Sequence, residues 1–393
     1  MKKILAMLLA LVMVMGLVAC GGNAPETTAP AENNDPAVST PDETTPAVTD
    51  TEYKIAMITD YGDITDQSFN QTTFEAVKAF AEANGVAYNY YKPSGDSTAE
   101  RVGMVDAAIA DGYNIIVLPG YAFGETLVEV ADVYPEVKFV ALDVAEGEGG
   151  FTATENVFSA VYQEELSGYM AGVAAVKLGY KHLGYLGGMA VPAVQRFGYG
   201  FLQGVDAAAK ELGIVDQIKV EYIYGNQFYG DADITAVMDT WYGEKGVECV
   251  FACGGGIWTS AAEAAAKVGG KVIGVDVDQA ATIDGLYGEG MTVTSAMKGL
   301  APTVETVLSA IVLEDNWAAY AGKIETLGLV SADPEANYVQ IPMGTTQFAE
   351  GFTAEDYSAL VAAMFDGTIT VSNDIANFPV TEVAVEQHAN IKG

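Results

Sequence analysis

The sequence has few of the side chains on which most catalytic, metal and nucleic-acid sites depend. Its two histidines, His182 and His388, lie in no nucleophile or metalloprotease motif. Lysine and arginine together number 18 against 53 acids, which gives a net charge of −35. This balance excludes the basic footprint of a nucleic-acid surface and argues against attraction to anionic lipid. We expect neither enzymatic activity nor a bound metal or cofactor.

Arginine is scarce, and its scarcity bears on the ligand. The only arginines are Arg101 and Arg196. Sites for carboxylate or phosphate groups usually use arginine, whose planar head binds them through two hydrogen bonds. We therefore expect a ligand that offers hydroxyl and ring N–H donors to carboxylates, rather than an anion.

Cysteine is scarce too, with three residues in the chain. Cys249 and Cys253 lie in the run VECVFACGGG. An extended strand would separate their Cα atoms by roughly 13 Å, which is too far for a disulfide. We expect both to be small buried side chains.

The third cysteine, Cys20, ends the N-terminal run MKKILAMLLALVMVMGLVAC. Two lysines and an apolar stretch slightly short for a membrane helix indicate a signal peptide over residues 1–20. Its end, LVAC, resembles a bacterial lipobox, in which Cys20 is lipidated, so we expect a lipid-anchored protein on the extracytoplasmic face of the cell membrane. Residues 21–52 are rich in Pro, Thr and acids and predict a disordered linker.

From Tyr53 onward, strand-like apolar runs alternate with helical patterns. The first series runs from YKIAMI to KFVALD, and a second runs from HLGYLGG to KVIGVDVD. Such alternation is typical of parallel sheets covered by helices on both faces. We therefore expect an α/β fold with two doubly wound lobes. Ligands of such sheets bind at the carboxyl ends of the strands.

Polar residues follow several of these predicted strands. The acids are Asp60, Asp143, Asp276 and Asp278, and the glycine run CGGGIW includes Gly255. Their shared position at strand ends favours one binding site. The alternatives are that each aspartate caps the next helix and that the glycines form a tight turn.

Aromatic residues and one lysine complete the candidate set. Phe69, Phe197 and Trp258 could stack on a flat ligand, although phenylalanine at helical spacing is more often core. Phe69 is followed by Asn70 at a helix start. Lys298 follows a strand and could meet the acids, or it could be an ordinary solvated lysine.

The run DYGDITDQSFNQTTFEA resembles the D-x-G-x-x-x-D-x-S-F-N-Q opening of the basic membrane protein family, the substrate-binding lipoproteins of ABC importers for nucleosides. GYLGGMAVPAVQRFGYGFLQG, IGVDVDQ and TSAMKG are similar to later motifs of that family, in the same order. The resemblance covers roughly Lys54 to Leu313. It implies the type I periplasmic-binding-protein fold, in which two hinged lobes trap a ligand, here a nucleoside and most often a purine nucleoside.

The resemblance also implies roles for the candidate residues. Asp60 and Asp143, with Asn70 nearby, would bind ligand hydroxyls or ring nitrogens. Phe69 and Phe197 would sandwich the base. The ribose or the base edge would be bound by Lys298 and by one of Asp276 and Asp278. Two features depart from the family pattern, Tyr61 and the turn containing Trp258.

The expected organisation is an N-terminal lobe of residues 53–155 plus about 292–320, and a C-terminal lobe of residues 156–291 plus about 321–393. The expected partners are a small ligand and a membrane permease, and the expected state is a monomer. A sensor that presents a bound nucleoside or sugar-like signal to a membrane signalling protein is the alternative function.

Overall fold

The computed structural model describes residues 52–393. The predicted signal peptide, the predicted lipidation site Cys20 and nearly all of the predicted linker lie outside the described residues. Within residues 52–393, no helix has the length and hydrophobicity needed to cross a bilayer.

Six parallel strands form the first sheet, in the order β11-β5-β4-β3-β1-β2. Their bounds are Lys54–Ile58 for β1, Ala87–Tyr91 for β2, Ile115–Pro119 for β3, Lys138–Leu142 for β4, Val157–Tyr162 for β5 and Lys323–Leu327 for β11. Successive residues of β1 face opposite ways, so that Ile55 and Met57 pack under one pair of helices while Ala56 and Ile58 pack under another.

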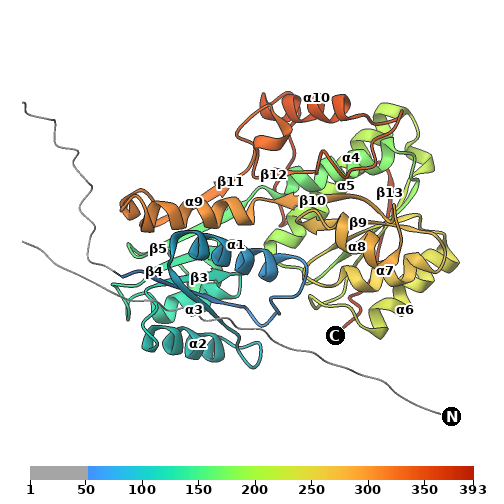
Figure 1. Cartoon of the computed structure of the whole chain (residues 1–393). Helices are drawn as coiled ribbons and strands as arrows, with labels where there is room; N and C mark the ends of the chain where they lie inside the picture. The colour runs from blue at the N-terminus through green and yellow to red at the C-terminus, as the bar shows by residue number, and fades with distance from the viewer. Residues whose placement is uncertain (1–51) are drawn as a thin grey trace, which may run out of the picture. The chain divides into compact units, whose positions relative to one another are not determined.

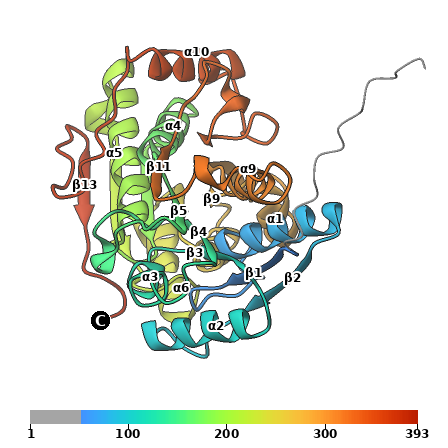
Figure 2. The same ribbon diagram turned by 90° about the vertical axis from the view of Figure 1, so that its left-hand side faces the viewer.

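The two helix layers of the first lobe follow from this alternation. Figure 2 shows α1 and α9 on one side of β1 and β2, and α2 on the other. The helices are α1 (Phe69–Asn84), α9 (Leu300–Val312), α2 (Thr98–Ala110) and α3 (Phe123–Val130). Both faces of the sheet are therefore covered, as the sequence predicts.

The second sheet has seven strands in the order β12-β10-β9-β8-β6-β7-β13, and only β12 is antiparallel to its neighbour. The bounds are His182–Gly187 for β6, Lys219–Tyr224 for β7, Cys249–Cys253 for β8, Lys271–Asp276 for β9, Thr292–Lys298 for β10, Val339–Gln340 for β12 and Ala384–Gln387 for β13. Cys249 and Cys253 are buried and free, which confirms their prediction.

Figure 1 shows α4 and α5 on one side of the second sheet, with α10 outside them, and α6 and α7 on the other side. The helices are α4 (Glu164–Lys177), α5 (Pro192–Leu212), α6 (Ala232–Thr240), α7 (Trp258–Ala266), α8 (Ala280–Tyr287) and α10 (Ala354–Phe365). Three glycines allow α4 and α5 to lie very close. A Cβ at Gly168, Gly200 or Gly204 would approach a backbone oxygen of the opposite helix to 2.2, 2.1 and 2.1 Å.

The lobe boundaries differ from those expected. Strand β10 was placed in the N-terminal lobe, but it pairs with β9 in the second sheet. Strands β5 and β11 were placed in the C-terminal lobe, but they pair with each other in the first sheet. The chain passes from one lobe to the other at three places, which follow the complete strands β5, β10 and β11. The three crossings lie side by side. Gln163 N donates to Leu327 O at 2.9 Å, and Tyr338 links the other two crossings, because Gly299 N donates to Tyr338 O at 2.7 Å and Tyr338 N donates to Gly328 O at 3.1 Å.

Candidate functional site

A cavity of about 360 Å³ lies between the two sheets, at the carboxyl ends of their strands. Its walls include the ends of β1, β3 and β4 from the first sheet and of β8, β9 and β10 from the second. The candidate residues that line it are Asp60, Phe69, Asn70, Asp143, Phe197, Gly255, Asp276 and Lys298. The structure thus brings together most of the residues that the sequence singled out.

The turn after β1 presents two acceptors to this cavity. Asp60 Oδ1 accepts from the backbone N–H groups of Tyr61 and Gly62, both at 2.7 Å. A Cβ at Gly62 would lie 2.5 Å from Asn70 Nδ2, which explains the glycine of the D-x-G pattern. Burial raises the pKa of Asp60, although these backbone donors act against the shift. Among residues 52–393, Asn70 Oδ1 is buried without a hydrogen-bond partner.

The start of α1 is capped by Asp66 and not by Ser68. Asp66 Oδ1 accepts from Ser68 N at 2.9 Å and Gln71 N at 3.1 Å, and Oδ2 accepts from Asn70 N at 2.9 Å. This arrangement leaves the Ser68 hydroxyl free to donate to Asp276 Oδ2 of the opposite lobe at 2.6 Å. The helix start therefore forms part of the contact between the lobes.

Lys298 lies at the centre of the cavity's charged groups and is only 5% exposed. Its Nζ forms an ion pair with Asp143 Oδ2 and lies 3.5 Å from Glu164 Oε1 and 3.8 Å from Asp276 Oδ1. Burial acts to lower the pKa of Lys298, but the three acids outweigh it and raise that pKa well above its usual value. Burial raises the pKa of Asp143 to about 7 despite the adjacent ammonium.

Three aromatic rings border the same ammonium group, and two of them line the cavity. Lys298 Nζ lies 4.6 Å from the ring centroid of Phe69 and 5.7 Å from that of Phe197. Asp143 Oδ1, also on the cavity wall, is buried without a hydrogen-bond partner in the described part of the chain. The cavity thus combines flat apolar surfaces with unpaired acceptors, an arrangement suited to a ring that carries N–H or O–H donors.

Asp143 and Asp276 hold an uncommon backbone conformation. Their φ angles are 62° and 66°, in the left-handed region that few residues other than glycine adopt. Aspartate tolerates this region better than most residues. Such conformations concentrate at binding sites, because the surrounding structure must compensate for their cost.

Residues 53–332 match the family model described as ABC transporter substrate-binding protein PnrA-like, or Bmp. The chain belongs to the Bmp family. That family is one of substrate-binding proteins of ABC transporters.

Individual relatives agree with this family. The chain is 29% identical over 242 residues to the ABC transporter nucleoside-binding protein BmpA of Lactococcus lactis, covering 58% of this chain and 65% of that one. It is 28% identical over 292 residues to basic membrane protein B of Borreliella afzelii, covering 70% and 78%. The match therefore spans slightly less than two thirds of the Lactococcus protein.

Solved structures show the fold. The crystal structure of a solute-binding protein of an ABC transporter system from Aeropyrum pernix superposes with a TM-score of 0.62 at 24% identity, covering 82% of this chain and 88% of that chain. The two parallel α/β sheets and such neighbours confirm the type I periplasmic-binding-protein fold.

Two predicted site residues of this Bmp protein do not line the cavity. Trp258 is 2% exposed and packs in the core beneath α6 and α7, with its ring centroid 6.5 Å from that of Tyr287. Asp278 accepts from Ala280 N at 3.1 Å and from Thr345 Oγ1 at 2.8 Å, so it caps α8. Asp278 therefore belongs to the start of the next helix, Trp258 is a core residue, and Asp276 is the acid that reaches the cavity.

Neither Glu164 nor Arg196 is predicted as a site residue from the sequence. Glu164 is 0% exposed at the first turn of α4, and its Oε2 accepts from Arg196 Nε of α5 at 2.6 Å. Arg196 lines the cavity. The close packing of α4 on α5 brings the pair together, and no sequence spacing reveals it. The rarity of arginine was the one available signal, because one of only two arginines lies in the motif after β6.

Contacts between the lobes explain Tyr61, the unusual residue of the first turn. Its hydroxyl lies 3.7 Å from Met189 Sδ of the second lobe, and the hydroxyl of Tyr121 lies at the same distance from that sulfur. On another side of the cavity, Gln279 Nε2 donates to Gln67 O at 2.9 Å. The described structure is therefore a closed arrangement of the lobes.

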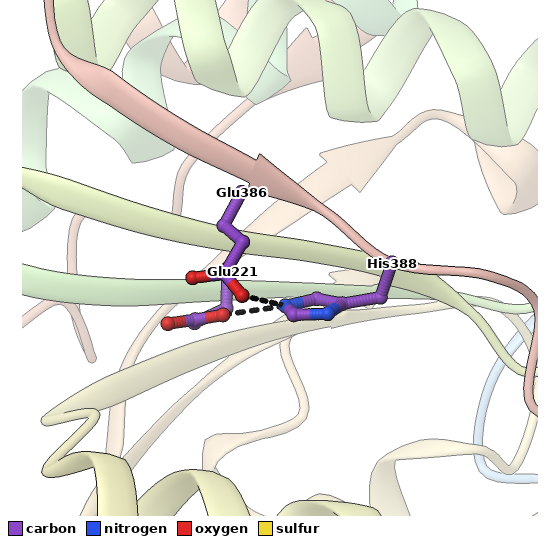
Figure 3. Close-up of side chains that lie close together, drawn as sticks. All are labelled: Glu221, Glu386 and His388. Atoms are coloured by element: carbon purple, nitrogen blue, oxygen red, sulfur yellow. Dashed lines mark hydrogen bonds and ion pairs between the residues drawn. The ribbon is translucent and has the colours of Figure 1, made fainter.

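One group in the described residues has the spacing of metal ligands, far from the cavity at the sheet edge. Figure 3 shows His388 beside Glu221 of β7 and Glu386 of β13. However, Lys219 Nζ and Lys245 Nζ each lie 2.7 Å from a Glu221 oxygen. Burial acts to raise the pKa of Glu221, but hydrogen bonds from these lysines outweigh it and lower the pKa to about 2. We interpret the group as an ion-pair network that fastens β13.

Proposed function

We propose that this protein captures an uncharged nucleoside between its lobes and delivers it to a membrane permease, with purine nucleosides as the first candidates. The observation that carries this proposal is the pairing of two ring-stacking side chains, Phe69 and Phe197, with two unpaired buried acceptors, Asn70 Oδ1 and Asp143 Oδ1, in one cavity. Aromatic faces stack on a base, and buried acceptors favour its N–H and O–H donors. The name of the Lactococcus relative supports the same ligand class.

The charge of the cavity argues against phosphorylated ligands. Three cations line it, Lys92, Arg196 and Lys298, and each is already paired with an acid. The carboxylates of the lining outnumber them: Asp60, Asp63, Asp66, Asp143, Glu148 and Asp276. A phosphate would enter a region of excess negative charge, where few donors remain available to it.

Closure of the lobes is the proposed mechanism of capture. Asp60 and Asn70 belong to the first lobe and Lys298 to the second, so a ligand meets its full set of partners only when the lobes close. The closed form then presents to the permease a surface that the open form lacks. We also propose that Cys20 carries a lipid that holds the protein on the extracytoplasmic face of the membrane.

A thermal-shift screen of nucleosides, nucleobases, sugars and amino acids tests the ligand class. A ligand that binds only the native state raises the melting temperature by an amount that grows with the logarithm of the ratio of its concentration to its Kd. Stabilisation by nucleosides, and by no other class, is the expected result. Stabilisation by sugars or amino acids alone would overturn the proposal.

A further inference from the structure

A second cavity, of about 560 Å³, adjoins the first one. Tyr121, Glu148, Val191 and Pro192 line both cavities. The other walls of the second cavity come from the first turn of α2, the start of α3 and Ala190 of the second lobe. We call this second cavity the annex. Because both lobes contribute to it, it takes shape together with the closed ligand site.

Hydrogen-bond acceptors dominate the annex. Three carboxylates line it, those of Asp96, Glu125 and Glu148, against one guanidinium, that of Arg101. Arg101 Nη1 is already paired with Asp96 Oδ1 at 2.6 Å. The excess of acids disfavours an anion and favours a group that donates hydrogen bonds.

The carboxylates of the annex are held in place by the protein itself. Glu125 Oε2 accepts from the hydroxyl of Thr98 at 2.5 Å, and Glu148 Oε2 accepts from Ala145 N at 2.9 Å. Such contacts leave further acceptor positions on each carboxylate, since an ionised carboxylate has about four lone-pair sites. The carboxylates are therefore preorganised, and binding of a ligand group would require little further loss of side-chain entropy.

Arg101 adds a donor to the same wall. Its side chain is 5% exposed, and its Nε has no hydrogen-bond partner among residues 52–393. A buried donor left without a partner costs free energy that a ligand oxygen can recover. One hydroxyl group can donate to a carboxylate and accept from a guanidinium, whereas an ammonium can only donate.

We propose that the annex is a second subsite of the ligand site, which takes a hydroxyl- or amine-bearing extension of the bound nucleoside. This inference rests on the proposed nucleoside function and narrows it. Nucleosides with such a substituent then bind more tightly than the parent nucleoside, and phosphorylated ones gain nothing from the annex.

Isothermal titration calorimetry of the full-length protein tests the annex with four probes. Three of them are adenosine, 5′-amino-5′-deoxyadenosine and N6-(2-aminoethyl)adenosine, so that an amine extends from either end of the ligand. We expect one of the two amines to bind about 10-fold more tightly than adenosine, as a charge-assisted hydrogen bond allows. N6-(2-hydroxyethyl)adenosine is the matching hydroxyl-bearing probe, and if neither it nor either amine binds more tightly than adenosine, the annex is not a subsite.

Variants that touch only the annex separate the two subsites. The double variant Asp96→Asn, Glu125→Gln and the space-filling variant Ala190→Trp should each abolish the gain and leave adenosine affinity within about 2-fold. Glu129→Gln, on the exposed side of α3, is the matched control and should keep the gain. A gain that survives in both annex variants overturns the assignment. If adenosine and the other nucleosides fail to bind at all, the proposed function itself falls.

Discussion

The molecule contains two buried clusters of acidic and basic side chains. The central residue of one is a cation surrounded by acids, and the central residue of the other is an acid surrounded by cations. In the cleft, Lys298 is surrounded by acids, and the pKa of Asp143 is raised to about 7. At the sheet edge, Glu221 is surrounded by cations, and its pKa is lowered to about 2. The cleft cluster leaves Asp143 Oδ1 without a partner in the described structure, whereas both Glu221 oxygens are paired. An incomplete cluster is suited to a ligand, and a complete one is suited to holding the fold together.

The largest difference in stability should appear when one lysine is removed from each cluster. Lys298→Met leaves buried acids without their shared partner, and we expect a loss of about 3–5 kcal/mol in the free energy of unfolding, together with loss of ligand binding. Lys245→Met removes a partly exposed lysine whose role Lys219 can share, and should cost about 1 kcal/mol or less.

Urea denaturation gives both stability changes, and calorimetry gives the affinity of whichever variants fold. Equal losses for the two variants, with ligand binding retained in Lys298→Met, would contradict the distinction between the clusters. Lys298→Arg, which keeps the charge, serves as the second cleft variant if Lys298→Met does not fold.

The next largest effect concerns aromatic residues in the two regions. Phe69→Ala removes a ring that borders the cavity and should weaken nucleoside binding by about 1–3 kcal/mol, as loss of base stacking does elsewhere. Phe378→Ala removes a ring that packs on Tyr222 near the sheet edge, with centroids 5.2 Å apart. We expect that control to lower stability and leave affinity unchanged. Calorimetric affinities that fall equally in both variants would exclude stacking by Phe69.

The smallest effect that we expect is on the pH dependence of stability, which should have opposite signs for the two clusters. Asp143 has an ordinary pKa of 3.8 and a folded value of about 7, so the folded state holds a proton that the unfolded state releases between these pH values. Stability from this group is therefore lost as the pH rises from 4 to 7. Glu221, with an ordinary pKa of 4.5 and a folded value of about 2, contributes stability above pH 4.5 that is lost as the pH falls toward 2.

Melting temperatures of the ligand-free protein measured from pH 4 to pH 8 test this contrast. Asp143→Asn removes the titrating carboxyl group and should flatten the fall in melting temperature between pH 4 and pH 7. Glu221→Gln should leave that slope unchanged. A steeper slope in Asp143→Asn would show that burial does not raise the pKa of Asp143.

Much of this architecture could be predicted from the sequence, because periodicity and strand ends are local signals. The alternation of strands and helices gave two parallel sheets, and acids after strands gave Asp60, Asp143 and Asp276 on the cavity wall. Asp276 and Asp278 have the same local pattern, and only the backbone path separates the cavity acid from the helix cap.

The features that could not be predicted from the sequence depend on tertiary packing. Glu164 reaches Lys298 and Arg196 because α4 and α5 approach closely at glycines, which no spacing in the sequence reveals. The chain order of strands also does not show which sheet a strand joins, and this is why β5, β10 and β11 were assigned to the wrong lobes. Both failures concern contacts between segments that are far apart in the chain.

We propose that the acid-rich, incompletely paired cluster in the cleft binds an uncharged nucleoside. The most direct measurement is a calorimetric titration of the full-length protein with guanosine and with guanosine monophosphate under one buffer condition. We expect guanosine to bind and the monophosphate to bind at least about 10-fold more weakly, because more carboxylates than cations line the cavity. Equal or tighter binding of the monophosphate, or no binding of guanosine or any other nucleoside, would contradict this proposal.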